Sequence, residues 1–381
     1  MKELEKRYFE IFNEKNAYAF SCGGRFEILG NHTDHNHGLC LAATCNLAIT
    51  ALVTPKEEIV RFHSEGFDPF FVDLKDLSIH DEETNHSPSL VRGVAAYLKE
   101  HGYNIGGFDA YSVSNIFKGA GVSSSAAFEL LVAEIFNSLY NDNSIPKIVL
   151  AKAGQYAENV YFGKKSGLLD QVGVGFGNIS YIDFKDIDNP KIETVDFPFK
   201  HLHFVIVNTG GSHAELSDLY SQIPQDMYEA AHAMGHNFLI EGSPDELEKV
   251  KDKISLSSYE RALHFYGENS RVTRAMKALK NKDEKEFLNC ILGSRESSCY
   301  LLKNMMVGSN YEGSPLEATD LALEIMKGRG ACKINGGGFA GSIICVVPEE
   351  CLKEFLDKMS DKYGKENVVE IYVRETGPVR L

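Results

Sequence analysis

The sequence predicts an α+β fold in which strand-like and helix-like segments alternate along the whole chain. Two observations support this prediction. Residues 42–53 and 204–207 are β-rich apolar runs, and residues 124–140 carry apolar side chains at helical spacing. No repeat or low-complexity tract interrupts the alternation, which is typical of layered α/β or α+β domains. With 381 residues, the chain has room for two or three domains.

The helices predicted in the first half are amphipathic. The helix over residues 124–140 has one apolar stripe, formed by Phe128, Leu131, Val132, Ile135 and Leu139. The next helix is expected to start near Ser144, a capping residue with Pro146 close behind it, and to run to about residue 161.

In the second half, helices are predicted over residues 217–235 and 243–267. Ser243 caps the latter, and Pro244 occupies its first helical position. A helical pair is expected from residue 272 to 306, and an αββ-like ending after residue 316. The polar stretch 183–198 leads into a strand at 201–207. We therefore predict two domains, over residues 1–197 and 198–381.

Composition limits the partners. There are 39 Lys and Arg against 54 Asp and Glu, a net charge of −15 that repels nucleic acid and anionic membranes. No apolar run reaches the roughly 18 residues of a membrane span, and the N-terminus is too charged for a signal peptide. The eight cysteines form no CxxC pair and are expected to be reduced and buried. A cytoplasmic protein is expected.

The first polar cluster spans residues 24–38. Its side chains His32, Asp34, His35 and His37 are types that bind transition metals, but no second Cys or His cluster supplies further ligands. Three interpretations stay open: a polar loop facing a substrate, a solvated loop with turn-forming residues, and a metal site.

The second cluster spans residues 118–127 and opens the helix predicted at residue 124. Small residues let backbone N–H groups approach a ligand, and a helix N-terminus adds unpaired donors and a positive dipole end, so the pattern favours a phosphate. An ordinary serine-capped helix is the alternative. The segment Gly-Lys-Lys-Ser at 163–166 is no Walker A loop, because Glu158 stands where its first glycine belongs.

The third cluster, residues 335–341, formally matches GxGxxG. A dinucleotide fingerprint must open a helix, whereas residues 342–347 read as a strand. We therefore expect a glycine-rich turn packed closely against another part of the molecule.

In this order and spacing, the three clusters resemble the three motifs of the GHMP small-molecule kinases, and the first resembles the galactokinase signature. Further segments resemble that family at residues 92–94, at residues 167–171 and at His213 with Tyr220. The resemblance implies a two-lobed fold with the active site in the cleft between the lobes. It implies ATP-dependent phosphorylation of galactose, or a close analogue, at the C1 hydroxyl. The partners would then be sugar and ATP with Mg²⁺, and a monomer is compatible with it.

Site residues follow from the same resemblance, position by position. Asp170 would be the catalytic acid–base group, and Arg25 its partner. The residues matching the triphosphate loop are Gly119, Ala120, Gly121, Ser123, Ser124, Ser125 and Ala126. Ser125 and Glu158 match the Mg²⁺ positions. Those matching sugar contacts are Asn31, His32, Asp34, Gly167 and Tyr220.

The sequence departs from the family pattern at the sugar end. Glu27 stands where the signature has Asn, and Asn31 where it has a Glu that usually contacts the sugar C6 hydroxyl. Loss of that carboxylate would admit a C6 acid such as galacturonate, because like-charge repulsion is removed. The alternative is a compensated exchange in which the two residues trade roles and galactose is still bound. A non-catalytic sensor of galactokinase type is a further alternative.

Overall fold

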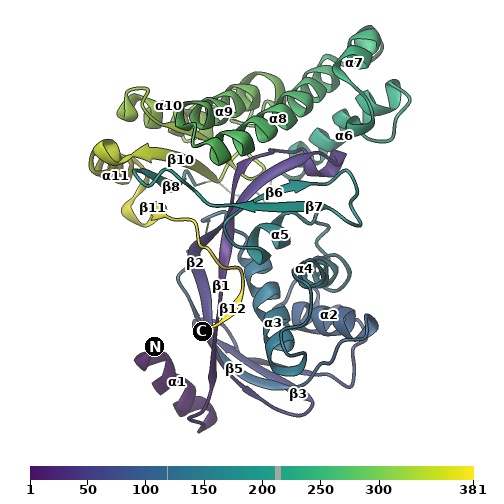
Figure 1. Cartoon of the computed structure of the whole chain (residues 1–381), viewed down its shortest axis with the longest axis vertical. Helices are drawn as coiled ribbons and strands as arrows, with labels where there is room; N and C mark the ends of the chain where they lie inside the picture. The colour runs from purple at the N-terminus through teal and green to yellow at the C-terminus, as the bar shows by residue number, and fades with distance from the viewer. Residues whose placement is uncertain (118, 211–215) are drawn as a thin grey trace.

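The computed structural model describes residues 1–117, 119–210 and 216–381 of the chain. In this part of the chain the strands pair into two sheets. The larger sheet has the order β12-β1-β2-β5-β3-β4, with β6 paired to β2 and β7 paired to β6. The smaller sheet has the order β11-β8-β10-β9 and lies in the upper half of Figure 1.

The strands of the larger sheet are β1 (Tyr18–Leu29), β2 (Leu39–Pro55), β3 (Ile59–Ser64), β4 (Phe70–Asp73), β5 (Phe108–Ser114), β6 (Ile179–Asp183), β7 (Lys191–Val195) and β12 (Val379–Arg380). Those of the smaller sheet are β8 (Leu202–Asn208), β9 (Ala331–Asn335), β10 (Ser342–Pro348) and β11 (Val368–Ile371). The C-terminal segment runs back from the smaller sheet and adds β12 to the larger one, so the first and last strands of the chain pair (Figure 1).

The helices of the lower half are α1 (Lys2–Phe12), α2 (Ser87–Glu100), α3 (Ser124–Tyr140), α4 (Lys147–Tyr156) and α5 (Leu169–Gly175). Those of the upper half are α6 (Ser217–Ala233), α7 (Pro244–Val250), α8 (Leu256–Asn281), α9 (Glu284–Ser297), α10 (Pro315–Met326) and α11 (Glu349–Tyr363). Short turns are η1 (Asp34–Asn36), η2 (Asp81–Glu83), η5 (Leu239–Glu241), η6 (Lys251–Lys253) and η8 (Lys365–Asn367), and the π-helical segments are η3 (Ala157–Phe162) and η7 (Ser298–Leu302).

Apolar cores hold both halves together. One core lies between the larger sheet and α2, α3 and α4. Another joins β1 and β2 of that sheet to β8 of the smaller sheet and to α8 and α9. The long strands β1 and β2 run from one half into the other (Figure 1), so the two halves share backbone as well as apolar contacts.

The mixed α/β layering and the helix at 124–140 are confirmed, the latter with the predicted ends. The helix expected near Ser144 begins three residues later, at Lys147, because Pro146 takes an extended conformation and acts as its N-cap. The helix at 217–235 and the strands at 42–53 and 204–207 are also confirmed.

The single helix predicted over residues 243–267 is wrong. Ser243 does cap α7 by accepting the N–H of Glu246, but the helical backbone is broken at Ile254. Ser255 caps a new helix, α8, which continues to Asn281 and contains the start of the helical pair expected from residue 272. Ser255 was a second capping signal within one apolar-periodic segment.

The ending contains more than the predicted αββ unit. The helix α10 and the strands β9 and β10 are present, and α11, β11 and β12 follow them. The stretch 183–198, expected to be a polar connector, contains β7, which pairs with β6 and is largely solvent-facing. The chain passes from the larger to the smaller sheet between β7 and β8. The predicted boundary at residue 197 lies in this connection. The division of the chain into two domains stays a prediction.

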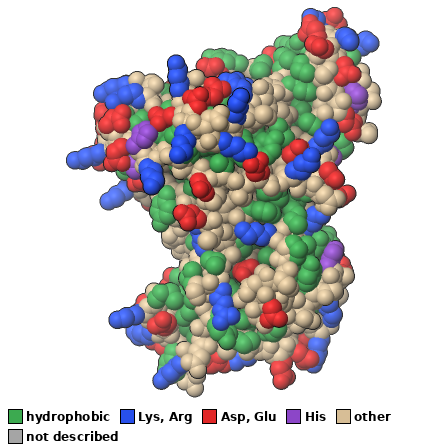
Figure 2. Space-filling model, viewed as in Figure 1, with side chains coloured by type: hydrophobic (Ala, Val, Ile, Leu, Met, Phe, Trp, Pro, Cys, Tyr) green, Lys and Arg blue, Asp and Glu red, His purple; other side chains and the backbone are tan. Residues whose placement is uncertain are grey.

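All eight cysteines are free, and seven of them are buried, as expected for small apolar side chains. On the face shown in Figure 2, acidic and basic side chains are interspersed over both halves, and the outline narrows between them. In the described ranges, no helix has the length and apolar character needed to cross a membrane.

Candidate active site

The second cluster forms a tight loop that leads into α3. Gly119 and Gly121 have φ values of +83° and +69°, which favour glycine. A Cβ on Gly121 would lie 2.4 Å from Ser342 Oγ, and one on Gly119 would lie 2.4 Å from Asn208 Nδ2. The loop is therefore pressed against the ends of β8 and β10, and larger residues would not fit there.

Residues Ser124, Ser125 and Ala126 form the first turn of α3, and Ser123 is its N-cap. The Ser123 side chain makes no capping hydrogen bond, since its backbone is left-handed (φ 55°, ψ 66°) and not extended as at a usual N-cap. Its hydroxyl donates to Asp170 Oδ2. Ala120 and Ala126 are buried, so their small side chains pack inside the fold. The helix N-terminus thus keeps N–H donors and a positive dipole end for an anion.

Arg25 and Asp170 form an ion pair beside the N-terminus of α3. Arg25 lies on β1, and its Nε and Nη2 atoms donate to Asp170 Oδ1 at 2.8 and 2.6 Å. Its Nη1 donates to the carbonyl of Gly121 at 2.7 Å, so one guanidinium connects the carboxylate to the loop of residues 119–126. We call this the phosphate loop, after the motif that it resembles. Asp170 is the second residue of α5, and Gly173 of that helix lets α5 approach the Arg25 side chain. The structure brings both predicted catalytic residues together.

The environment of Asp170 favours its ionised form. Burial by itself would raise the pKa of this carboxyl group, but the charge of Arg25 and the hydroxyl of Ser123 hold the pKa below its ordinary value. Two hydrogen bonds to Oδ1 and one to Oδ2 use three of the roughly four acceptor positions of a carboxylate. With its side chain 24% exposed, Asp170 can accept one more hydrogen bond, at Oδ2, from an incoming hydroxyl.

Ser125 and Glu158 form a second polar centre beside the loop. Ser125 Oγ donates to Glu158 Oε1 at 3.0 Å, and Lys164 Nζ lies 2.6 Å from the same oxygen. The other carboxylate oxygen, Oε2, accepts from Ser166 Oγ at 2.5 Å and from Gln171 Nε2 at 3.2 Å. Glu158 belongs to the π-helical segment η3, a local widening that often occurs at functional sites. A hydroxyl and a carboxylate are oxygen donors that suit Mg²⁺.

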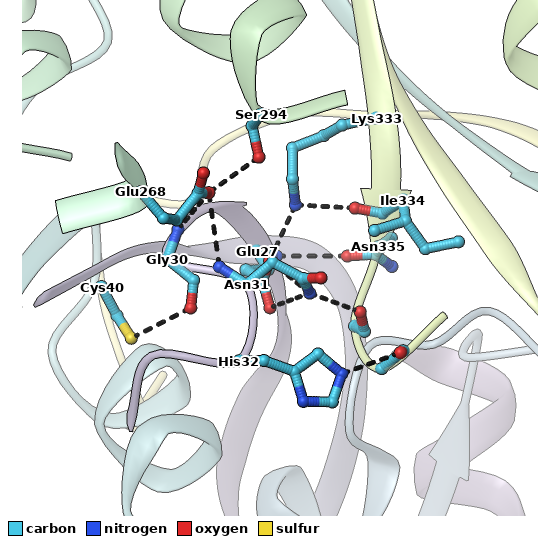
Figure 3. Close-up of polar contacts among 12 residues, drawn as sticks. Glu27, Gly30, Asn31, His32, Cys40, Glu268, Ser294, Lys333, Ile334 and Asn335 are labelled. Atoms are coloured by element: carbon cyan, nitrogen blue, oxygen red, sulfur yellow. Dashed lines mark hydrogen bonds and ion pairs between the residues drawn. The ribbon is translucent and has the colours of Figure 1, made fainter. Parts of the chain in front are cut away.

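The first cluster includes the connection between β1 and β2 (residues 30–38). We call it the sugar loop, because the family resemblance predicts sugar contacts there. Figure 3 shows that Asn31, at its start, is enclosed by polar groups. Its Nδ2 donates to Glu27 Oε1 at 3.1 Å and to the carbonyl of Gly336 at 2.7 Å, and its Oδ1 accepts from Asn304 at 2.9 Å. Both N–H groups of Asn31 are therefore used within the protein, and only Oδ1 has a free lone pair.

Glu27 is itself part of a buried ion pair. Lys333 Nζ lies 2.7 Å from Glu27 Oε1, and the lysine side chain is fully buried (Figure 3). The two residues at which the sequence departs from the family signature, Glu27 and Asn31, thus contact each other directly. This pairing supports a compensated exchange of roles.

His32 and Tyr220 both contact the third cluster. His32 Nε2 donates to the carbonyl of Gly337 at 2.8 Å, and the Tyr220 hydroxyl donates to that of Gly338 at 2.5 Å. A Cβ on Gly337 would lie 2.3 Å from the Tyr220 ring, so the glycine-rich turn packs closely against another segment, as expected. The strand β10 follows this turn, which confirms that it is not a dinucleotide fingerprint. His213 lies outside the described residues.

Asp34 opens the short turn η1 and faces the backbone of Gly167, where a Cβ would lie 2.8 Å from Asp34 Oδ2. Burial raises the pKa of Asp34 to about 6, against a backbone hydrogen bond from His35, and the negative charges of Glu27 and Asp170 add to the rise. The predicted sugar contacts Asp34 and Gly167 therefore lie side by side.

The metal interpretation of the first cluster has no support in the geometry. His37 stacks on Phe238 with ring centroids 3.8 Å apart, and His35 lies edge-on to Tyr228. Within the described part of the chain, no group of three or more His, Cys, Asp or Glu side chains is arranged to hold a metal ion.

Sequence reasoning missed several polar residues of this region. Lys333 had a signal, since it is a charged residue inside the apolar strand β9, where it is fully buried. Asn304 had none, because it reaches the site from a separate segment without a motif. Lys164 and Ser166 were noticed only as parts of a false Walker A match.

Two family models match parts of this chain, and its relatives cover nearly all of it. The GHMP kinases N terminal domain matches residues 89–178, and the galactokinase galactose-binding signature matches residues 6–55. A galactokinase of Lactococcus lactis subsp. lactis (strain IL1403) is 30% identical, with 99% of this chain and 95% of that protein covered. A galactokinase of Lactobacillus helveticus is 28% identical, with 97% and 94% covered.

Among solved structures, Lactococcus lactis galactokinase complexed with galactose superposes with a TM-score of 0.85, 27% identity and coverage of 100% of this chain and 99% of that one. A mevalonate kinase shares the fold, with a TM-score of 0.65, 16% identity and coverage of 94% and 99%.

Proposed function

Because the chain belongs to the galactokinase family of GHMP kinases, we propose that it transfers the γ-phosphoryl group of ATP to the C1 hydroxyl of galactose, giving the sugar 1-phosphate. The observation that carries the proposal is the Arg25–Asp170–Ser123 cluster at the N-terminus of α3. It places an ionised carboxylate, a guanidinium and a helix N-terminus around one point. Phosphoryl transfer requires mainly such positioning and charge stabilisation.

In this proposal Asp170 orients the C1 hydroxyl through its remaining acceptor position at Oδ2 and takes up the proton as the oxygen attacks. Arg25 uses three of its five N–H groups on Asp170 and Gly121, which leaves two for an oxygen of the transferring phosphoryl group. The same arginine thus aligns the base and stabilises the charge that develops during transfer.

The nucleotide is held by the backbone N–H groups of the loop from Gly119 to Ala126, which approach the phosphates because the loop residues are small. Ser125 and Glu158 would hold Mg²⁺, which when bound neutralises phosphate charge. Their oxygens already lie 3.0 Å apart. Lys164 Nζ lies 2.6 Å from Glu158 Oε1 and places a second positive charge beside this carboxylate.

On the sugar side, Asp34 would accept hydrogen bonds from ring hydroxyls beside Gly167. His32 and Tyr220, which donate to carbonyl groups of the glycine-rich turn, would contact the sugar as well. Asn31 would take part only as an acceptor, since its N–H groups are used. Glu27 keeps a carboxylate 3.1 Å from the Asn31 amide, which supports galactose itself rather than a C6 acid. A cytoplasmic location belongs to the same proposal.

The test is ADP release from ATP across galactose, galacturonate, arabinose and glucosamine. Turnover with galactose above the other sugars is expected. Turnover with galacturonate alone would replace galactose by the C6-acid alternative. Binding of ATP and galactose without turnover would show a sensor instead of an enzyme.

A further inference from the structure

One helix of the upper half, α8, contacts both ends of the sugar loop. The chain segments are far apart in sequence, and none of the family-like motifs includes α8. The contacts come from His264, Glu268 and Asn269. His264 and Glu268 are one helical turn apart and lie on the same face of α8, and Asn269 directly follows Glu268.

Glu268 holds the start of the loop. Its Oε1 accepts the backbone N–H of Gly30 at 3.0 Å and the hydroxyl of Ser294 at 2.7 Å (Figure 3), and Arg271 Nε donates to its Oε2 at 2.7 Å. The carboxylate is fully buried. Burial alone would raise its pKa, but the charge of Arg271 and other neighbours bring the pKa down to about 2. Glu268 is therefore an ionised acceptor for loop amides.

His264 holds the next peptide unit. Its Nε2 donates to the carbonyl of Asn31 at 2.9 Å, and its Nδ1 accepts from Ser297 Oγ at 2.8 Å. Burial lowers the pKa of His264 to about 4, so the ring is neutral, and a carbonyl partner requires the hydrogen on Nε2. Glu268 and His264 thus fix an N–H and a C=O at neighbouring positions of the loop.

Asn269 holds the end of the loop. Its Oδ1 accepts the backbone N–H of Leu39, the first residue of β2, at 2.6 Å. A Cβ on Gly38 would lie 2.8 Å from this Oδ1 and 2.8 Å from Phe265, so only glycine allows α8 to come this close.

We propose that His264, Glu268 and Asn269 are positioning residues that set the backbone of the sugar loop and thereby the placement of His32 and Asp34. The proposal rests on the proposed function, in which this loop binds galactose. None of the three contacts the phosphate loop, Arg25 or Asp170 through a hydrogen bond seen in the described residues. Their effect is therefore confined to sugar affinity and leaves nucleotide affinity and the chemical step unchanged.

The experiment measures kcat and the KM values for galactose and ATP in four variants of the full chain. Asn269→Ala removes the acceptor for Leu39, and Asn269→Asp keeps it. Glu268→Gln weakens the bond to Gly30, because a neutral amide is a poorer acceptor than a carboxylate. Arg274→Gln is the matched control on α8, since the Arg274 side chain is half exposed and pairs with Glu286, away from the sugar loop.

Asn269→Ala and Glu268→Gln are expected to raise the galactose KM by about 3- to 10-fold, with the ATP KM and kcat changed by less than about twofold. Asn269→Asp is expected to restore the galactose KM, and Arg274→Gln to leave it unchanged. An unchanged galactose KM in both altered variants would overturn the proposal, as would a parallel rise of both KM values. If Asn269→Ala does not fold, Glu268→Gln decides the question by the same criteria. Failure of the unaltered chain to phosphorylate galactose refutes the proposed function instead.

Discussion

Exchanging Glu27 and Asn31 tests whether these two residues act as one unit. In the structure a single fully buried cation, Lys333, lies 2.7 Å from Glu27, and Asn31 donates to the same carboxylate oxygen at 3.1 Å. Asn31→Glu would place two carboxylates around one lysine and lose the donor to Gly336. Glu27→Asn would leave Lys333 without its counter-ion.

Each single variant is expected to lose about 3–5 kcal/mol of folding free energy, because each leaves an uncompensated buried charge. The double variant Glu27→Asn/Asn31→Glu again has one carboxylate, one amide and one lysine. It should therefore be more stable than the sum of the single changes by about 1–3 kcal/mol.

Urea unfolding of the four proteins measures this coupling. The control is Glu193→Asn, which removes an exposed carboxylate 2.6 Å from Lys280 and should cost less than about 1 kcal/mol. Additivity of the two single changes within about 0.5 kcal/mol would refute the reasoning. The double variant is also the protein in which the preference between galactose and galacturonate should be measured. If position 31 sets tolerance at C6, its carboxylate should lower galacturonate use more than galactose use.

Three further predictions concern the site. Asp170→Ala should lower kcat by at least about 100-fold, with the Kd for ATP changed little, and retained turnover would remove Asp170 from the mechanism. The galactose KM should rise as the pH falls through about 6, since protonation of Asp34 removes its negative charge while Asp170, with a lowered pKa, stays ionised. The same dependence of the galactose KM on pH in Asp34→Asn would contradict this. Glu158→Gln should raise the Mg²⁺ concentration for half-maximal activity by about 10-fold or more. Ser166→Ala removes only a hydrogen-bond donor to Glu158 and should raise this concentration less. Equal Mg²⁺ dependence in the unaltered protein and both variants would exclude Glu158 as the ligand.

Local signals in the sequence were enough for much of the fold. The apolar stripe from Phe128 to Leu139 predicted α3 with its correct ends, and Pro244 after Ser243 predicted the start of α7. Ser255 was overlooked because helical periodicity continues across it, although the backbone is extended there. The edge strand β7 was missed because its mostly exposed residues carry no apolar alternation.

The site itself could be predicted only where a motif marks it. Arg25 and Asp170 are 145 positions apart, and no periodicity brings them together; the resemblance to a family did. Glu268 and Lys333 have no motif, and their roles depend on tertiary packing that buries them against the sugar loop. A charged residue inside an apolar strand, as at Lys333, is a signal that can be used in advance, because a buried charge requires a partner.

The central claim is phosphorylation of galactose at the C1 hydroxyl. Its most direct test is ³¹P NMR of a reaction mixture that contains the protein, ATP, Mg²⁺ and galactose. We predict one equivalent of ADP for each equivalent of a sugar phosphate whose phosphorus couples to the C1 proton. Phosphorylation at another hydroxyl, or ATP that stays intact in the presence of galactose, would contradict the proposed function.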